Sequence, residues 1–287
     1  MSFKRFDQED IVVSAESVTA PVWSGDQVSL TSFFTSSTQV GNNTGDFYYN
    51  VYQASASLAE ARVQFSIAYG HKDGAGSLSY NSAITGSPSQ TVYGQYRSLV
   101  LGDENAEFTF GGVASEHFYA LSIDRARFKE KLLPGSLLLK LTTSAGTINL
   151  TDNSNYVSTI TFGDSGREYE LVSASSAGVR FTGNGTDGVY GYNTASGSFG
   201  KFLPDIGVIL LNGDALDLAP ANGGITLGTS ATTASNSTNL DTIFKAVNDG
   251  GSFALRSEET VSSNYVFVRA RNSEFNYSTN PSNITGS

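Results

Sequence analysis

The sequence contains no cysteine and only two histidines among its 287 residues. Without thiols the chain cannot form disulfides, thiolate nucleophiles or cysteine-ligated zinc sites, and it suits folding in a reducing compartment. His71 and His117 are far apart in the chain, and no Gly-x-Ser-x-Gly turn is present to expose a serine beside either of them. We therefore interpret both as isolated histidines with no catalytic role, and we expect no metal and no cofactor.

Charged side chains are also scarce. They make up 15% of the chain, where soluble domains average roughly 25%. The net charge of −10 repels phosphates, which argues against nucleic acid as a partner. Serine, threonine, asparagine and glycine take the place of the missing charged residues. This composition is typical of short strands and turns, and of subunits that pack against neighbours in an assembly.

Long apolar runs are missing as well. The longest, Ile206–Leu211, is far below the ~20 residues that a membrane-spanning helix requires, so no membrane partner is expected. The first ten residues are polar and charged, unlike a signal peptide, which predicts synthesis in the cytoplasm.

The hydrophobic residues that are present follow β-strand patterns. Residues 61–69 alternate between apolar and polar positions up to Gly70, which predicts a strand with one buried face. Between residues 146 and 211, short apolar runs recur with turn residues about every ten positions. We predict a mainly β (α+β) fold with antiparallel β-sandwich or barrel-like sheets.

Two short helices interrupt this β pattern. A Ser-x-x-Gln capping box at Ser87–Gln90 precedes an apolar stripe and predicts a helix near 88–101. Apolar residues at helical spacing predict a second helix near 239–249, capped by Thr238 or Asn239.

The domain organisation follows from the same patterns. Residues 1–55 contain extended segments without a helical period, which indicates either an N-terminal arm lying along neighbouring subunits or an ordinary first sheet. Residues 56–287 form a β-rich body, with a division near residue 145 left open.

The motifs that suggest chemistry lack the context that the chemistry needs. Gly183–Gly188 matches the dinucleotide pattern G-x-G-x-x-G, but the β-prone Val189–Tyr192 follows it where a helix would have to begin. We interpret it as a β-turn. The adjacent carboxylates Glu258 and Glu259 are interpreted as solvated surface or subunit contact, since adjacency cannot place two carboxylates across a cleft. The sequence predicts no enzyme and no catalytic residue.

Two basic clusters are conspicuous in this acidic chain. One lies within Arg125–Lys131, a segment that fits either a strand or a short helix, and the other lies in a strand predicted over residues 264–271. Arginine beside aromatic residues suits pairing with the carboxylates of a neighbouring subunit. A solvated edge that discourages strand addition is the alternative. The candidate assembly contacts are Arg125, Arg127, Lys129, Lys131, Arg269, Arg271 and Trp23.

Several segments resemble a family of virion structural proteins from T4-like tailed phages of marine bacteria, especially cyanobacteria. They are Asp10–Ser24, Val63–His71, Tyr93–Arg97, Phe128–Gly135 and Glu258–Tyr277. None is a chemical motif, so the resemblance implies a tail or baseplate-type part of the particle and carries over no catalytic residue. Members of that family continue past the equivalent of Asn280, which implies a further C-terminal segment.

The resemblance and the composition together predict a non-enzymatic structural subunit in the tail, baseplate or neck of the virion. Its partners would be other virion structural proteins in a symmetric, multi-copy assembly. The alternative is a receptor- or carbohydrate-binding fibre module, because 14 tyrosines and the single Trp23 could stack on the sugars of a host surface glycan. A particle-borne hydrolase is a third hypothesis, which no motif supports.

Overall fold

The computed structural model describes residues 11–36, 47–74, 88–181, 191–230 and 236–267, and it contains two compact units. Unit 1 combines residues 1–18 with residues 260–287, and unit 2 comprises residues 19–259. This corrects the predicted domains in two respects. The N-terminal arm ends near Val18 and is joined by the C-terminal segment, and the strands on either side of residue 145 pair with each other.

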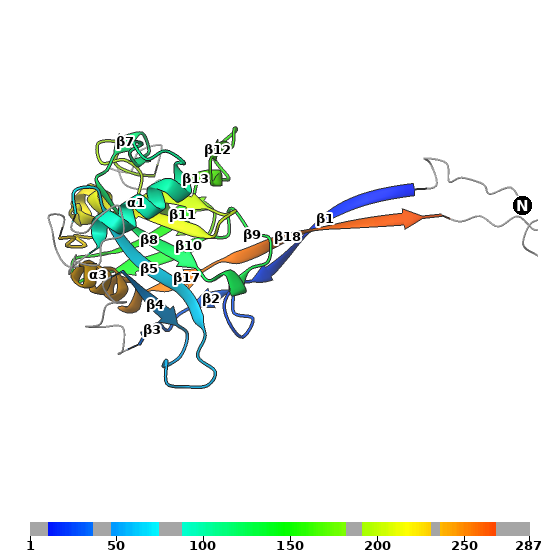
Figure 1. The fold of residues 1–287 in the computed structure, drawn as a ribbon, viewed down its shortest axis with the longest axis horizontal. Helices are drawn as coiled ribbons and strands as arrows, with labels where there is room; N and C mark the ends of the chain where they lie inside the picture. The colour runs from blue at the N-terminus through cyan, green and yellow to red at the C-terminus, as the bar shows by residue number, and fades with distance from the viewer. Residues whose placement is uncertain (1–10, 37–46, 75–87, 182–190, 231–235, 268–287) are drawn as a thin grey trace, which may run out of the picture. The chain divides into compact units, whose positions relative to one another are not determined.

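Unit 2 is built on one large antiparallel sheet, which curls as it runs through the order β2-β17-β10-β11-β13-β15-β16-β8-β5-β4-β3 (Figure 1). Two short strands, β12 and β14, pair with β13. The strands are β2 Ser29–Leu30, β3 Phe34–Thr35, β4 Tyr48–Tyr52, β5 Val63–His71, β8 His117–Ile123, β10 Leu138–Thr142, β11 Thr147–Asp152, β12 Thr161–Gly163, β13 Gly166–Ser176, β14 Val179–Arg180, β15 Gly200–Leu203, β16 Val208–Asn212 and β17 Ser252–Ala254.

The remaining elements are short or lie at the edge of this sheet. The helices are α1 Ser89–Val100, α2 Gly213–Asp217 and α3 Asn236–Asn248, with 3-10 turns η2 Arg125–Arg127 and η3 Pro220–Asn222. Strands β6 Thr109–Phe110 and β7 Val113–Ala114 pair with each other. A separate sheet has the order β1-β18-β9, from β1 Ile11–Pro21, β18 Arg256–Val266 and β9 Lys131–Leu132.

Both faces of the central strands β5, β8 and β16 are buried, and a different helix covers each face. On one face Ala68, Ala120 and Leu210 pack in a cluster with residues of α1. On the other, residues of α3 join the main core with the alternate side chains of the same strands. All of β16 is buried, which explains why its sequence is a continuous apolar run instead of alternating.

The prediction of a mainly β, antiparallel fold with helices is confirmed. Most of the described strands of unit 2 join one curled sheet and do not form two stacked sheets. The segment 156–162, predicted as a strand, is irregular up to residue 160 and enters β12 only at Thr161, and β15 and α2 were not predicted. The predicted strand ending at Gly70 continues to His71, which pairs with His117 of β8. Its second face is also buried, under α1, where one buried face was predicted.

The two predicted helices are confirmed, but their starts need comment. Ser87 lies outside the described residues, so its predicted capping role stays a prediction. The second helix begins at Asn236, earlier than predicted. Asn239 lies inside it, buried, and its side-chain amide bonds both the backbone N–H and the carbonyl of Ser230. The asparagine therefore anchors a preceding loop and does not cap the helix.

Candidate functional site

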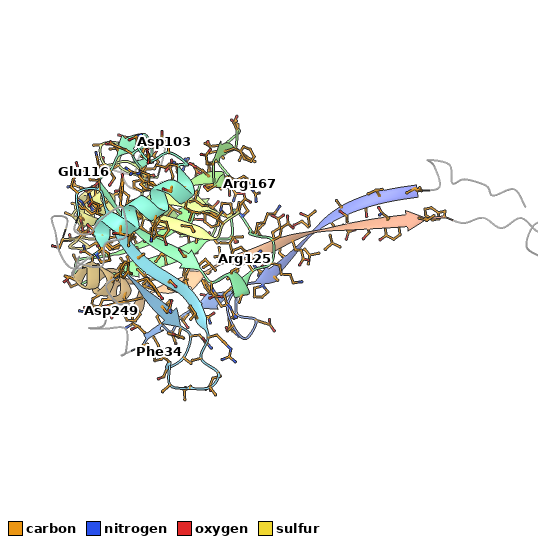
Figure 2. All side chains as sticks on the ribbon, in the orientation of Figure 1. Phe34, Asp103, Glu116, Arg125, Arg167 and Asp249 are labelled. Atoms are coloured by element: carbon orange, nitrogen blue, oxygen red, sulfur yellow. The ribbon has the colours of Figure 1, made fainter. Side chains whose placement is uncertain are left out.

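The described part of unit 1 is a two-stranded antiparallel ribbon (Figure 1). Residues 11–18 of β1 and 260–266 of β18 form it, and we define the ribbon as residues 11–18 and 260–267. Its large hydrophobic side chains are exposed on both strands, and Figure 2 shows side chains standing out along each of them. The exposed fractions are Ile11 42%, Val12 47%, Val13 66%, Val18 50%, Val261 41%, Tyr265 53%, Val266 47% and Phe267 64%.

The ribbon carries few of the features that protect free strand edges in soluble proteins. β1 is the terminal strand of its sheet, and the ribbon residues contain no lysine, arginine or proline. Natural edge strands usually carry lysine, proline or a bulge, which prevent a second chain from adding to the edge. A two-stranded ribbon is also marginally stable in water by itself. Exposed apolar side chains beside a free strand edge are typical of surfaces that another polypeptide can cover.

The base of β18 lies in unit 2, where the sequence-predicted basic cluster meets it. Glu258 is the register partner of Lys131 on β9, and their charged groups are 3.6 Å apart. Lys129 lies 3.0 Å from Glu259. The lysines thus pair with carboxylates of their own chain, and the prediction that they meet a neighbour's carboxylates stays a prediction.

The two arginines of this cluster are also engaged within unit 2. Arg125 donates to the backbone carbonyls of Phe128 and Lys129, and its guanidinium lies 4.6 Å from the Phe128 ring. Arg127 donates to the hydroxyl of Ser24. These bonds fix the η2 turn beside the base of β18, which makes the cluster a support for that strand. Arg269 and Arg271 lie outside the described residues.

Trp23 is part of the core. Its side chain is 2% exposed, and its ring centroid lies 4.8 Å from that of Phe253 and 6.1 Å from that of Phe65. A side chain buried in this way cannot present a surface to a partner or to a sugar. The prediction of Trp23 as an assembly contact is therefore wrong, and its role is to anchor the chain directly after β1.

Unit 2 carries further exposed apolar side chains at two places along β13. Tyr156 is 44% exposed and lies beside β14, because the backbone N–H of Arg180 donates to its hydroxyl. Val179 and Phe181, on either side of Arg180 in the sequence, are 44% and 37% exposed. Phe162, 71% exposed, lies apart from them, because β12 pairs with residues 166–168 of β13 and β14 pairs with residues 174–176, toward the other end of that strand. These side chains are therefore not one contiguous surface.

The two histidines are adjacent in space, contrary to the prediction that they are isolated. His71 and His117 are register partners on β5 and β8, and their rings stack with centroids 5.7 Å apart. Both side chains are buried. Asp214 lies 3.7 Å from His117 Nε2 and accepts a hydrogen bond from the Ser115 hydroxyl. The carboxylate thus stands between serine and histidine, which differs from the order serine–histidine–carboxylate of a catalytic triad.

His71 makes the stability of the fold depend on pH. Burial, and then the neighbouring His117, lower the pKa of His71 below its ordinary value, and nearby carboxylates oppose them only in part. The Nδ1 atom accepts a hydrogen bond from the Asp73 N–H, which the neutral ring permits. Because the unfolded chain binds this proton more tightly, the stability contributed by neutral His71 is present above pH 6.5 and is lost as the pH falls through its lower folded pKa.

We therefore expect His71→Gln to reduce the loss of stability that accompanies a fall in pH. The melting temperature of the parent chain should fall between about pH 7.5 and about pH 5.5, and that of the variant should fall by less. Thermal unfolding at a series of pH values measures the difference. An equal fall in both proteins would contradict the assigned role of His71.

Gly213 shows how tightly this cluster is packed. A Cβ atom at this position would lie 2.4 Å from His117 Nε2, closer than real side chains approach. We expect Gly213→Ala to lower the free energy of unfolding by about 1–3 kcal/mol through overpacking. In chemical denaturation, the Gly213→Ala/His117→Ala double variant should lose less unfolding free energy than the sum of the losses of the two single variants. Additive losses would contradict the contact.

A hollow of about 260 Å³ lies among β4, β5, β8 and α1. Its lining contains aromatic, aliphatic, serine and glutamine side chains, and no carboxylate, histidine, lysine or arginine. Ser122 in its wall is already bonded to the Tyr96 hydroxyl at 2.7 Å. This lining offers no group for acid–base chemistry near neutral pH.

Comparison with known proteins gives no match to a family model, a curated protein or a solved structure. In the ranges that the structure describes, no helix is long and apolar enough to cross a membrane. Over the same ranges, His, Asp and Glu side chains form no group of three or more that could hold a metal ion. Gly183–Gly188, the dinucleotide-like motif, lies outside those ranges.

Proposed function

We propose that the chain is a non-enzymatic structural subunit of a tailed-phage particle, in its tail, baseplate or neck, and that it acts through protein–protein contacts. The observation that carries the proposal is the ribbon. It presents apolar side chains on both strands and an unprotected edge, at a cost in solubility that an assembly partner would offset.

The virion and the position within it rest on the resemblance of the five sequence segments. The low charge and abundant aromatic residues support a role in assembly independently, since interface cores are depleted in charge and enriched in aromatic side chains. The non-enzymatic role is supported by the engaged state of the described buried acid groups. Asp152 accepts backbone hydrogen bonds from Gly135 and Ser154, and Glu170 accepts from Gly111 and Ser198.

Purified particles provide the test. Quantitative mass spectrometry of virions from the phage that encodes this chain should find it at a fixed, multi-copy ratio to the other structural proteins. Gentle separation of tails from heads should leave it with the tail fraction. Absence from washed virions, or loss at the first wash, would overturn the proposal, and recovery with heads would overturn the position in the tail.

A further inference from the structure

The hollow among β4, β5, β8 and α1 is built from one side of the helix and one face of the strands. The helix contributes three side chains at the i, i+3 and i+4 spacing that places them together: Val92, Gln95 and Tyr96. In the sheet, Ser122 of β8 is the register partner of Ser66, and Tyr48 of β4 is the register partner of Ala68. The small side chains at three of these four strand positions leave the space under α1 unfilled.

Aromatic side chains line the hollow and remain accessible to solvent. Phe47 and Tyr48 both belong to the lining, and they are 40% and 39% exposed. Trp23, by contrast, is buried in the main core and cannot stack on a sugar. An accessible tyrosine ring beside a hollow offers an apolar face for stacking and a hydroxyl for hydrogen bonding.

The polar groups of the lining have hydrogen-bonding capacity left over. The 2.7 Å bond between the Tyr96 and Ser122 hydroxyls uses only one of their two hydrogens. The Ser66 hydroxyl donates to Asn50 Oδ1 and keeps its lone pairs as acceptors. Gln95 is exposed, and its amide has no hydrogen bond to a described residue. The lining can therefore both donate and accept, which suits a ligand rich in hydroxyl groups better than an aliphatic one.

We propose that this hollow binds one uncharged pyranose ring, with an apolar face of the sugar stacked on Tyr48 and its hydroxyls bonded to Gln95 and the two serines. The sugar is uncharged because the lining contains no charged side chain. A volume of about 260 Å³ is below the roughly 300–1,000 Å³ of sites for drug-sized ligands, so it suits a single ring. The hollow lies in unit 2 and shares no residue with the ribbon, so this binding does not depend on the proposed function.

Sugar titration of the purified chain tests the site. The probes are the methyl glycosides of glucose, galactose, mannose and N-acetylglucosamine, followed by saturation-transfer NMR up to about 20 mM. At least one should bind with a dissociation constant on the order of 1 mM, as expected for a ligand this small. Disaccharides of the sugar that binds then distinguish a unit of a longer glycan, for which they retain affinity, from a free sugar, for which they lose it.

Two variants connect binding to the hollow. Tyr48→Ala removes the stacking ring, and Gln95→Leu removes the amide while keeping a side chain of similar size. Each should weaken binding at least about fivefold. Tyr156→Ala is the matched control, because it deletes a tyrosine that is 44% exposed and lies outside the hollow, and it should bind like the parent. Circular dichroism and melting temperatures establish that each variant is folded.

The outcomes separate a sugar site from other occupants. Glycoside binding that both variants weaken and the control retains supports the proposal. No binding up to about 20 mM, or binding that Tyr48→Ala leaves unchanged, overturns it. Binding of p-cresol that no glycoside displaces would also overturn it, because the hollow would then accept an apolar side chain. None of these results alters the expected presence of the chain in virions, so the proposed function is judged separately.

Discussion

Trp23→Ala is expected to lower the free energy of unfolding by about 3–5 kcal/mol, the cost of deleting a large buried aromatic side chain. Trp23 is 2% exposed and packs with Phe65 and Phe253. Its position just after β1 means that the loss falls where β1 enters unit 2. Urea denaturation of the purified chain measures the change directly.

Trp23→Phe provides the matched control. The indole N–H of Trp23 is buried without an acceptor among the described residues, so phenylalanine removes an unsatisfied donor and keeps most of the apolar contact. We expect it to cost much less than alanine. Equal stability of the alanine variant and the parent would contradict the core position of Trp23.

Val13→Asp together with Val261→Asp is expected to abolish assembly. Each change places a carboxylate on an exposed valine of the ribbon, one on each strand. An interface position that must be desolvated loses about 2 kcal/mol or more on such a change, roughly thirtyfold in affinity for each side chain. Sedimentation velocity of the purified chain, and incorporation into particles during infection, measure the loss.

Leu99→Asp is the control for this pair. Leu99 lies on α1 and is 51% exposed, so the change is of the same chemical kind on a surface to which no contact is assigned. It should assemble like the parent. Unchanged assembly of the ribbon variant, or equal loss in the Leu99 variant, would contradict a specific role for the ribbon.

Much of the fold is predictable from this sequence, because short-range patterns determine much of it. Alternation identified β5, and helical spacing identified α3. The features that these patterns missed depend on contacts with elements that are distant in sequence. Tyr156–Phe162 has β propensity, yet only its end pairs with β13, since the preceding turn is fixed by bonds such as that from the Tyr156 N–H to the Asn153 carbonyl.

The candidate site was harder to predict, because its charged residues pair with residues that are remote in sequence. The basic residues 125–131 were conspicuous in an acidic chain, but their carboxylate partners Glu258 and Glu259 are remote in sequence and become neighbours only through the pairing of β9 and β18. The same holds for His71 and His117, which strand register brings together. Composition alone could not indicate that the ribbon combines the two ends of the chain.

The absence of cysteine permits a direct measurement of the central claim, that the ribbon is covered in the assembled state. Val13→Cys introduces the sole thiol at a side chain that is 66% exposed, and Leu99→Cys does the same on α1. Both should react rapidly with a maleimide in the isolated chain. In assembled particles, the account predicts that Val13→Cys becomes protected while Leu99→Cys stays reactive; equal labelling of Val13→Cys in the isolated and assembled states would contradict it.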